Sequence, residues 1–164
     1  MTEPNLYDLK TNMPLVAADN IIDAALAAGT AAGMLPLTVA VLDAGGHTVA
    51  LKRQDGKRHP AGGYCHGQGL GGPRHGHTQR RTIRDRLGER PAFQGALVGA
   101  SHGRFVPVPG GVLVLNGDVQ VIGAVGISGD TSEKDEYCAI QGIKAAGLAS
   151  APAEPDENWQ GSGL

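Results

Sequence analysis

The clearest candidate for chemistry is a histidine that follows a glycine pair at a predicted turn. His47 comes directly after Gly45-Gly46, and Asp43 stands four residues before it, at the end of an apolar run. An imidazole here could ligate a metal ion or polarise a substrate. Asp43 could accept hydrogen bonds from turn amides or act as a ligand. A histidine that only begins a strand and faces solvent is the structural alternative.

Further along the chain, His102 lies just past a predicted helix, where an imidazolium would interact favourably with the helix dipole. Pro109, Gly110 and Gly111 follow it, and glycine lets a ligand approach the backbone closely. These residues could equally make a tight corner that leads into the next strand. The predicted cofactor-binding set is therefore Asp43, His47, His102, Pro109, Gly110 and Gly111.

Residues 59–79 hold a second group of reactive side chains within the sequence HPAGGYCHGQGLGGPRHGHTQ. Thiolate and imidazole ligands suit zinc or copper, and Cys65, His66, His75 and His77 are candidates. However, their spacing matches no familiar zinc motif, and adjacent ligands such as Cys65 and His66 rarely close one tetrahedron. The simpler interpretation is a flexible glycine-rich loop, so no metal site is expected.

Composition bounds the possible functions. The chain has 164 residues, which suits one domain, and its formal net charge is −2, which provides no electrostatic basis for binding nucleic acid or an anionic membrane. No apolar run reaches the length of a membrane span, and the N-terminus lacks the apolar core of a signal peptide. We therefore expect a cytoplasmic protein. The sequence contains no Ser-His-Asp arrangement, phosphate loop or dinucleotide motif.

The elements that must position these residues follow from hydrophobic periodicity. A helical pattern opens and closes the chain, and two hairpins stand between, separated by two short helices; this order predicts an α+β fold with helices on an antiparallel sheet. Residues 150–164 are rich in Pro, Ala, Ser, Gly and acid, which predicts a flexible tail after a domain at 1–149. The predicted elements are helix 15–34, hairpin 37–53, helices 81–88 and 91–101, hairpin 112–128 and helix 131–147.

Three stretches resemble the GlcG/HbpS family. They read VAVLDAGGHTVALKR at 39–53, FVPVPGGVLVL at 105–115 and VIGAVGISGDTSEKDEYCAIQGIKAAG at 121–147. The resemblance implies a profilin-like fold with about five strands, assembled as homo-oligomers. Several relatives bind haem or related tetrapyrroles, so it also implies a small-molecule binding protein with haem as the candidate cofactor. The alternatives are an uncharacterised enzyme or accessory protein in small-organic-acid metabolism, and a structural oligomer without a ligand.

Residues 59–79 depart from this family, whose members carry a long amphipathic helix at that place. The segment has no helical period, and each glycine would cost a helix about 1 kcal/mol. We therefore expect a loop there. When its codons are read one base forward, the frame can spell IRLEDIATGKAWGALGMG, which has helical periodicity and resembles the missing helix. The hypothesis is a pair of compensating frameshifts, one near Arg58 and one near Gln79-Arg80.

This hypothesis predicts that the DNA around codons 58–81 encodes the amphipathic helix in the next reading frame. Sequencing the gene and measuring the intact mass of the expressed protein check it together. A mass that matches the printed sequence would mean that the segment is present in the protein. DNA that cannot encode the helix in the next frame would rule out the frameshifts.

Overall fold

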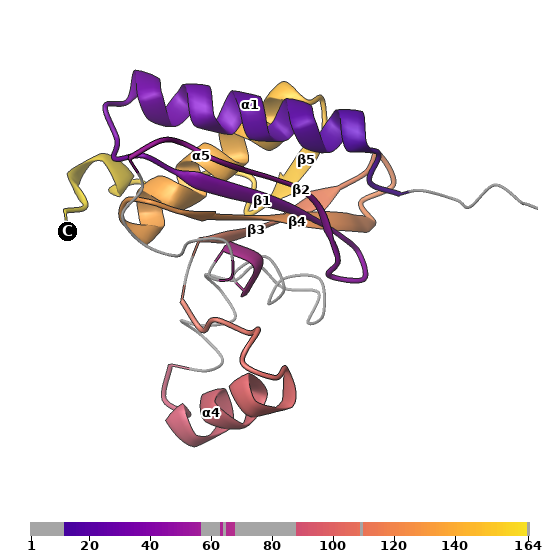
Figure 1. The fold of residues 1–164 in the computed structure, drawn as a ribbon, viewed down its shortest axis with the longest axis vertical. Coiled ribbons are helices and arrows are strands. Elements are labelled where there is room, and N and C mark those ends of the chain that lie inside the picture. The colour runs from indigo at the N-terminus through magenta and orange to yellow at the C-terminus, as the bar shows by residue number, and fades with distance from the viewer. Residues whose placement is uncertain (1–11, 57–62, 64, 68–87, 109, 164) are drawn as a thin grey trace, which may run out of the picture.

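In the computed structural model, residues 12–56, 63, 65–67, 88–108 and 110–163 are described. Five strands of this part of the chain form one antiparallel sheet in the order β2-β1-β4-β3-β5 (Figure 1). The predicted α+β fold with a five-stranded antiparallel sheet is therefore confirmed. The elements are α1 (Leu15–Ala31), β1 (Thr38–Asp43), β2 (Thr48–Arg53), α4 (Pro91–Ala100), β3 (Gly111–Leu115), β4 (Val121–Ser128), α5 (Ser132–Ala145), β5 (Ala149–Ala151) and the 3-10 helix η2 (Trp159–Gly161).

These bounds confirm the two predicted hairpins and the predicted helices at 15–34, 91–101 and 131–147, each within a few residues. The predicted helix at 81–88 lies outside the described residues. Helix α5 begins where the sequence offers a cap, because the Thr131 hydroxyl accepts a hydrogen bond from the Lys134 amide. No helix in the described ranges is long and apolar enough to cross a bilayer.

Helices α1 and α5 lie side by side on one face of the sheet (Figure 1). Helix α1 covers the β1–β2 half, and α5 covers β3, β4 and β5. The apolar face of α1 repeats at the helical period, with Ala18, Ile21, Ile22 and Ala25 all fully buried. From α5, Cys138, Ala139, Ile140 and Ile143 join the same core against the valines of β1 and β3.

The two helices approach each other closely at a glycine. A Cβ atom added at Gly142 of α5 would overlap the carbonyl oxygen of Ile21 and would lie 3.0 Å from the Ala25 Cβ in α1. Glycine at this position therefore lets the two backbones meet. Backbone contact of this kind leaves no room for side-chain adjustment, so the spacing of α1 and α5 is fixed here.

The C-terminal residues pack on the domain, in contrast to the predicted boundary at 149. Strand β5 pairs with β3, and the Trp159 ring stacks on Tyr137 of α5 with centroids 3.8 Å apart. The Ser162 hydroxyl also shares a hydrogen bond with the Thr131 hydroxyl. Composition predicted a tail because it cannot show tertiary contacts. Here these contacts are the pairing of β5 with the edge of β3 and the stacking of Trp159 on Tyr137. The contacts of the described domain continue to Ser162.

The opposite face of the sheet receives part of the unusual segment. Residues 63 and 65–67 have helical backbone, so the loop predicted for residues 59–79 is wrong at these four positions; the others lie outside the described residues. Cys65 is fully buried against Ala40 of β1, and its thiol donates to the Thr38 carbonyl over 3.1 Å. The physical reason is burial, because a small apolar side chain here fills space above a small residue of the sheet.

The α1–α5 contact generates a stability prediction. Gly142→Ala should lower the free energy of unfolding by about 1–3 kcal/mol, because the added methyl group overpacks a backbone contact. Urea denaturation followed by circular dichroism measures this change. Gly95→Ala in α4 is the matched control, since a Cβ there meets no atom within 4 Å. It should leave stability unchanged or raise it by up to about 1 kcal/mol, through higher helix propensity. Equal losses in both variants would contradict the prediction.

Candidate functional site

The candidate site is built on the turn that joins β1 to β2. Asp43 is the last residue of β1, and its carbonyl accepts the Gly46 amide over 3.0 Å. Gly46 has φ +82°, a conformation that favours glycine. The Asp43 carboxylate accepts the His47 amide at Oδ1 over 2.9 Å. The prediction that Asp43 accepts turn amides is therefore confirmed, and the same contact fixes where His47 begins the second strand.

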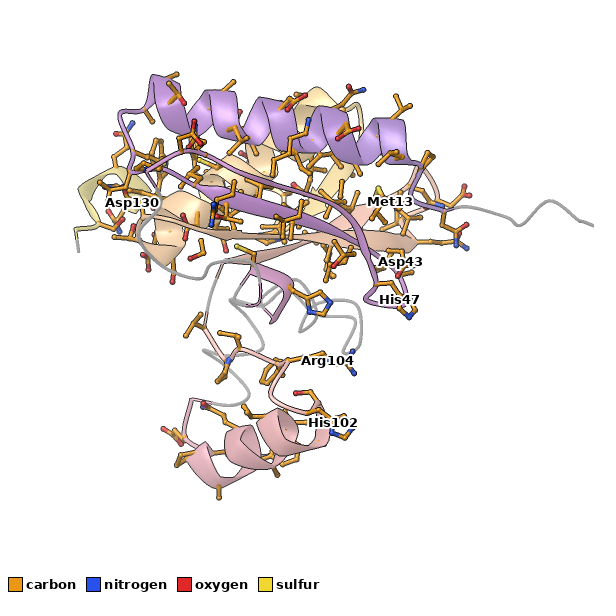
Figure 2. The ribbon with its side chains drawn as sticks, in the orientation of Figure 1. Met13, Asp43, His47, His102, Arg104 and Asp130 are labelled. Carbon is orange, nitrogen blue, oxygen red and sulfur yellow. The ribbon has the colours of Figure 1, made fainter. Side chains whose placement is uncertain are left out.

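The carboxylate of Asp43 also holds the His47 ring. Its Oδ2 lies 3.2 Å from His47 Nδ1, while the His47 side chain remains 81% exposed at the end of the hairpin (Figure 2). In the tautomer whose Nδ1 carries the proton, this nitrogen donates to Asp43 and Nε2 keeps a free lone pair. An imidazole oriented by a carboxylate in this way is the usual arrangement of a metal-ligating histidine.

Electrostatics favours this tautomer. Desolvation alone would raise the pKa of Asp43, but hydrogen bonds from the His47 amide and ring, and from the Gly45 amide, outweigh it. The pKa of Asp43 is lowered from its ordinary value of 3.8 as a result. The carboxylate is therefore ionised at neutral pH and accepts the Nδ1 proton of His47.

Gly45 provides the space in which the pair forms. A Cβ atom at Gly45 would lie 2.9 Å from both Cε1 and Nδ1 of His47, and 3.2 Å from Oδ1 of Asp43. Real Cβ atoms essentially never lie within 3.0 Å of another heavy atom, so the His47 ring would have to shift, and the contact with Asp43 would also be tight. The two glycines of the turn thus have different roles, because Gly46 supplies a positive φ and Gly45 leaves room for the imidazole. This steric role of Gly45 was not predicted from the sequence, although the spacing of Asp43, Gly45 and His47 indicates it.

His66 reaches the same turn from the unusual segment. Its Nε2 lies 3.1 Å from the Gly46 carbonyl oxygen, and its side chain is half-buried. The structure thus separates two of the predicted metal-ligand candidates, since neighbouring Cys65 is buried against the sheet. His75 and His77 lie outside the described residues. Within the described ranges, no group of three or more His, Cys, Asp or Glu side chains could hold a metal ion.

The other predicted site residues that the structure describes do not join the turn. Gly111 is the first residue of β3 and pairs with Gly126, which pairs with Ala40 of β1. Asp43 stands three residues further along β1, so Gly111 is displaced by about 10 Å along the strands and by two strand spacings across them. Gly110 and Gly111 are buried. They form the corner into the strand, the alternative left open by the sequence, and Pro109 lies outside the described residues.

His102 lies beyond the end of α4, as predicted, and has φ +53°. Its amide donates to the Gly99 carbonyl in the turn that ends the helix, and its side chain is exposed. Figure 2 shows it on the projecting part of the chain, below the sheet and its hairpin. The sequence prediction placed His102 in one site with Gly110 and Gly111, but the described contacts do not bring His102 to these glycines.

A family model described as "Haem degrading protein HbpS-like" matches residues 13–144, which include both hairpins, α1 and nearly all of α5. The chain belongs to this family. A search of curated proteins found no match to this HbpS-like chain.

Solved structures share the HbpS-like fold at low sequence identity. Klebsiella pneumoniae protein ORFY is 21% identical with a TM-score of 0.73, over 90% of this chain and 98% of that one. A PduOC:heme complex is 20% identical with a TM-score of 0.72, over 83% and 96%. A double mutant of Streptomyces reticuli HbpS is 20% identical with a TM-score of 0.68, over 88% and 93%. These likenesses establish the fold.

The Asp43–His47 pair generates a pH prediction. Because the folded-state pKa of Asp43 is lowered, its contribution to stability is present above the unfolded pKa, near 3.8, and is lost as pH falls through the folded value. NMR titration of the Asp43 carboxyl carbon should give a midpoint below 3.8. In His47→Ala the midpoint should move up toward the ordinary value, whereas exposed His102→Ala should leave it unchanged. A midpoint at or above 3.8 in the unsubstituted protein would contradict the pairing.

Proposed function

We propose that this HbpS-like chain binds haem or a related tetrapyrrole, with His47 as its ligand to the metal, and that it works as a homo-oligomer. The observation that carries the ligand proposal is the Asp43–His47 pair, which directs Nδ1 inward over 3.2 Å and leaves Nε2 at an exposed hairpin end. An imidazole nitrogen is a common axial ligand of haem iron, so the donor chemistry fits the group. The family description and the haem named in the PduOC structure support the same ligand class.

The chain's own residues have distinct positions around this ligand. Asp43 orients the imidazole through Nδ1, so that Nε2 faces away from the carboxylate, while Gly45 leaves room for the ring. His66 meets the turn at the Gly46 carbonyl, with its Nε2 3.1 Å from that oxygen. Bound haem would supply an iron centre, and the protein side would then tune it through the Asp43 carboxylate.

The cysteine of the last helix is not a nucleophile candidate. Burial, followed by the negative charges of Asp135 and Asp130, raises the pKa of Cys138 to about 12. Its thiol lies 3.4 Å from the Met34 sulfur and is buried in the core. A thiol with this pKa is protonated at neutral pH and is a poor nucleophile. Cys138 therefore packs as a small apolar side chain.

A haem titration tests the proposal. Addition of haem at tens of micromolar to the purified chain should shift the Soret band, and His47→Ala should abolish the shift. Asp43→Asn and Gly45→Ala should weaken binding by about 10- to 100-fold, since both disturb the orientation of the ligating ring. His102→Ala is the matched control, because it removes an exposed imidazole distant in sequence from the turn, and it should bind haem unchanged.

Three results would contradict the ligand assignment. The first is a chain that gives no spectral change, and the second is equal binding by His47→Ala and the unsubstituted protein. The third is loss of the band in His66→Ala with retention in His47→Ala, which would move the ligand to the other imidazole at the turn.

A further inference from the structure

The turn of the β3–β4 hairpin holds the one Asn-Gly pair of the chain, Asn116-Gly117. A glycine nitrogen has no side chain beside it, so it can approach the carboxamide of the preceding asparagine closely. The other asparagines of the chain precede leucine, methionine, isoleucine or tryptophan, whose side chains hinder this approach. Gly117 is also exposed to solvent. Attack of a backbone nitrogen on an asparagine side chain is therefore least hindered at this turn.

Hydrogen bonds within the hairpin fix the orientation of the Asn116 carboxamide. Its Oδ1 accepts the Asp118 amide over 3.0 Å and the Gln120 amide over 2.9 Å. Its Nδ2 donates to Gln120 Oε1 over 3.1 Å. The contact with Asp118, two residues on, is an Asx turn, which folds the carboxamide back toward the intervening Gly117 peptide. Two backbone N–H groups thus converge on one side-chain carbonyl oxygen.

We propose that Asn116 is a site of spontaneous deamidation and that the folded hairpin promotes the reaction. Two N–H donors on a carbonyl oxygen polarise its carbon and stabilise the oxyanion that forms on attack. The Gly117 nitrogen loses its proton to solvent base and forms a bond to Asn116 Cγ, which places the negative charge on Oδ1. The Cγ–Nδ2 bond then breaks, Nδ2 takes a proton from water and leaves as ammonia, and a succinimide ring remains. Water opens this ring at either carbonyl and gives an aspartyl or an isoaspartyl residue.

The conformation of Val119 shows how firmly the turn is held. It has φ +61°, which a β-branched residue rarely adopts, and its side chain is 76% exposed. Its amide donates to the Asn116 carbonyl over 3.1 Å. Together with the bonds to Oδ1, this contact keeps the turn closed around Asn116. The carboxamide is therefore held in one conformation beside Gly117, which reduces the entropy lost on ring closure.

The two products differ in their effect on the hairpin. An aspartate at position 116 keeps an oxygen acceptor for both amides and adds one negative charge. An isoaspartate directs the backbone through Cβ and Cγ, which adds a methylene group next to the last pair of the ladder, Leu115 with Val121. The β1–β2 turn lies at the same end of the sheet, since Asp43 pairs with Gly123 of β4 (Figure 1). The modification is independent of haem binding.

Incubation of the full chain for days at mildly alkaline pH tests this proposal. The peptide that contains Asn116 should gain about one dalton, and protein isoaspartyl methyltransferase should label it. Gly117→Ala should reduce both signals by roughly tenfold, because the methyl group hinders the attacking nitrogen. The fold should tolerate this change, since Gly117 has no positive φ and its Cβ would meet no atom within 4 Å. Gly95→Ala, which has equal space but no preceding asparagine, is the matched control and should react like the unsubstituted chain.

Comparison with the unfolded chain tests the contribution of the hairpin. Asn116 should react several-fold faster in the folded protein than in guanidinium chloride, where the two N–H contacts to Oδ1 are lost. An equal or slower rate in the folded protein would overturn the role of the fold. Absence of any mass gain at Asn116, or equal reaction of Gly117→Ala and the unsubstituted chain, would overturn the site itself.

Discussion

The contact between Gly142 and the carbonyl of Ile21 sets the spacing on which the rest of the structure depends. It brings α5 against α1 backbone to backbone, and the isoleucines of both helices then seal one face of the sheet. Strand β1 lies beneath them, paired on both sides by β2 and β4. A strand held on both edges and packed on its inner face has little freedom at its end. Asp43 is the last residue of β1, so its backbone is held in a fixed position.

The candidate site combines a rigidly held carboxylate, that of Asp43, with an exposed imidazole, that of His47. Asp43 is held by the turn amides, and through it the His47 ring is oriented while remaining exposed to solvent. Preorganisation of this kind reduces the entropy that a ligand must remove when it binds the ring. Glycine recurs at the points of closest approach in both places, with Gly142 between helices and Gly45 beneath the imidazole. An added methyl group would collide with the Ile21 carbonyl at Gly142, and with the His47 ring at Gly45.

The elements predicted with most success are those whose burial repeats along the sequence. Helix α1 and both hairpins show their period in the sequence, and the spacing of Asp43, Gly45-Gly46 and His47 predicted the turn that the structure has. Strand β5 could not be found this way, because three residues are too few to show alternation and its pairing depends on the open edge of β3. Gly111 was grouped with His47 because pairing register, which separates them, is not visible in the sequence.

The contacts of the candidate site are of two kinds: some lie within the β1–β2 hairpin, and one involves the unusual segment at 59–79. The Asp43–His47 pair and the Gly45 gap involve only the β1–β2 hairpin, which lies wholly within the part that matches the HbpS-like family. The His66–Gly46 contact depends on the unusual segment, and reading His66-Gly67 in the next frame would replace this histidine by Thr or Met. A chain with the family helix in that place would therefore keep the oriented imidazole of His47 and lose the second imidazole at the turn. Metal ligation by His47 is thus the more robust expectation, because it requires no residue from the segment whose reading frame is in question.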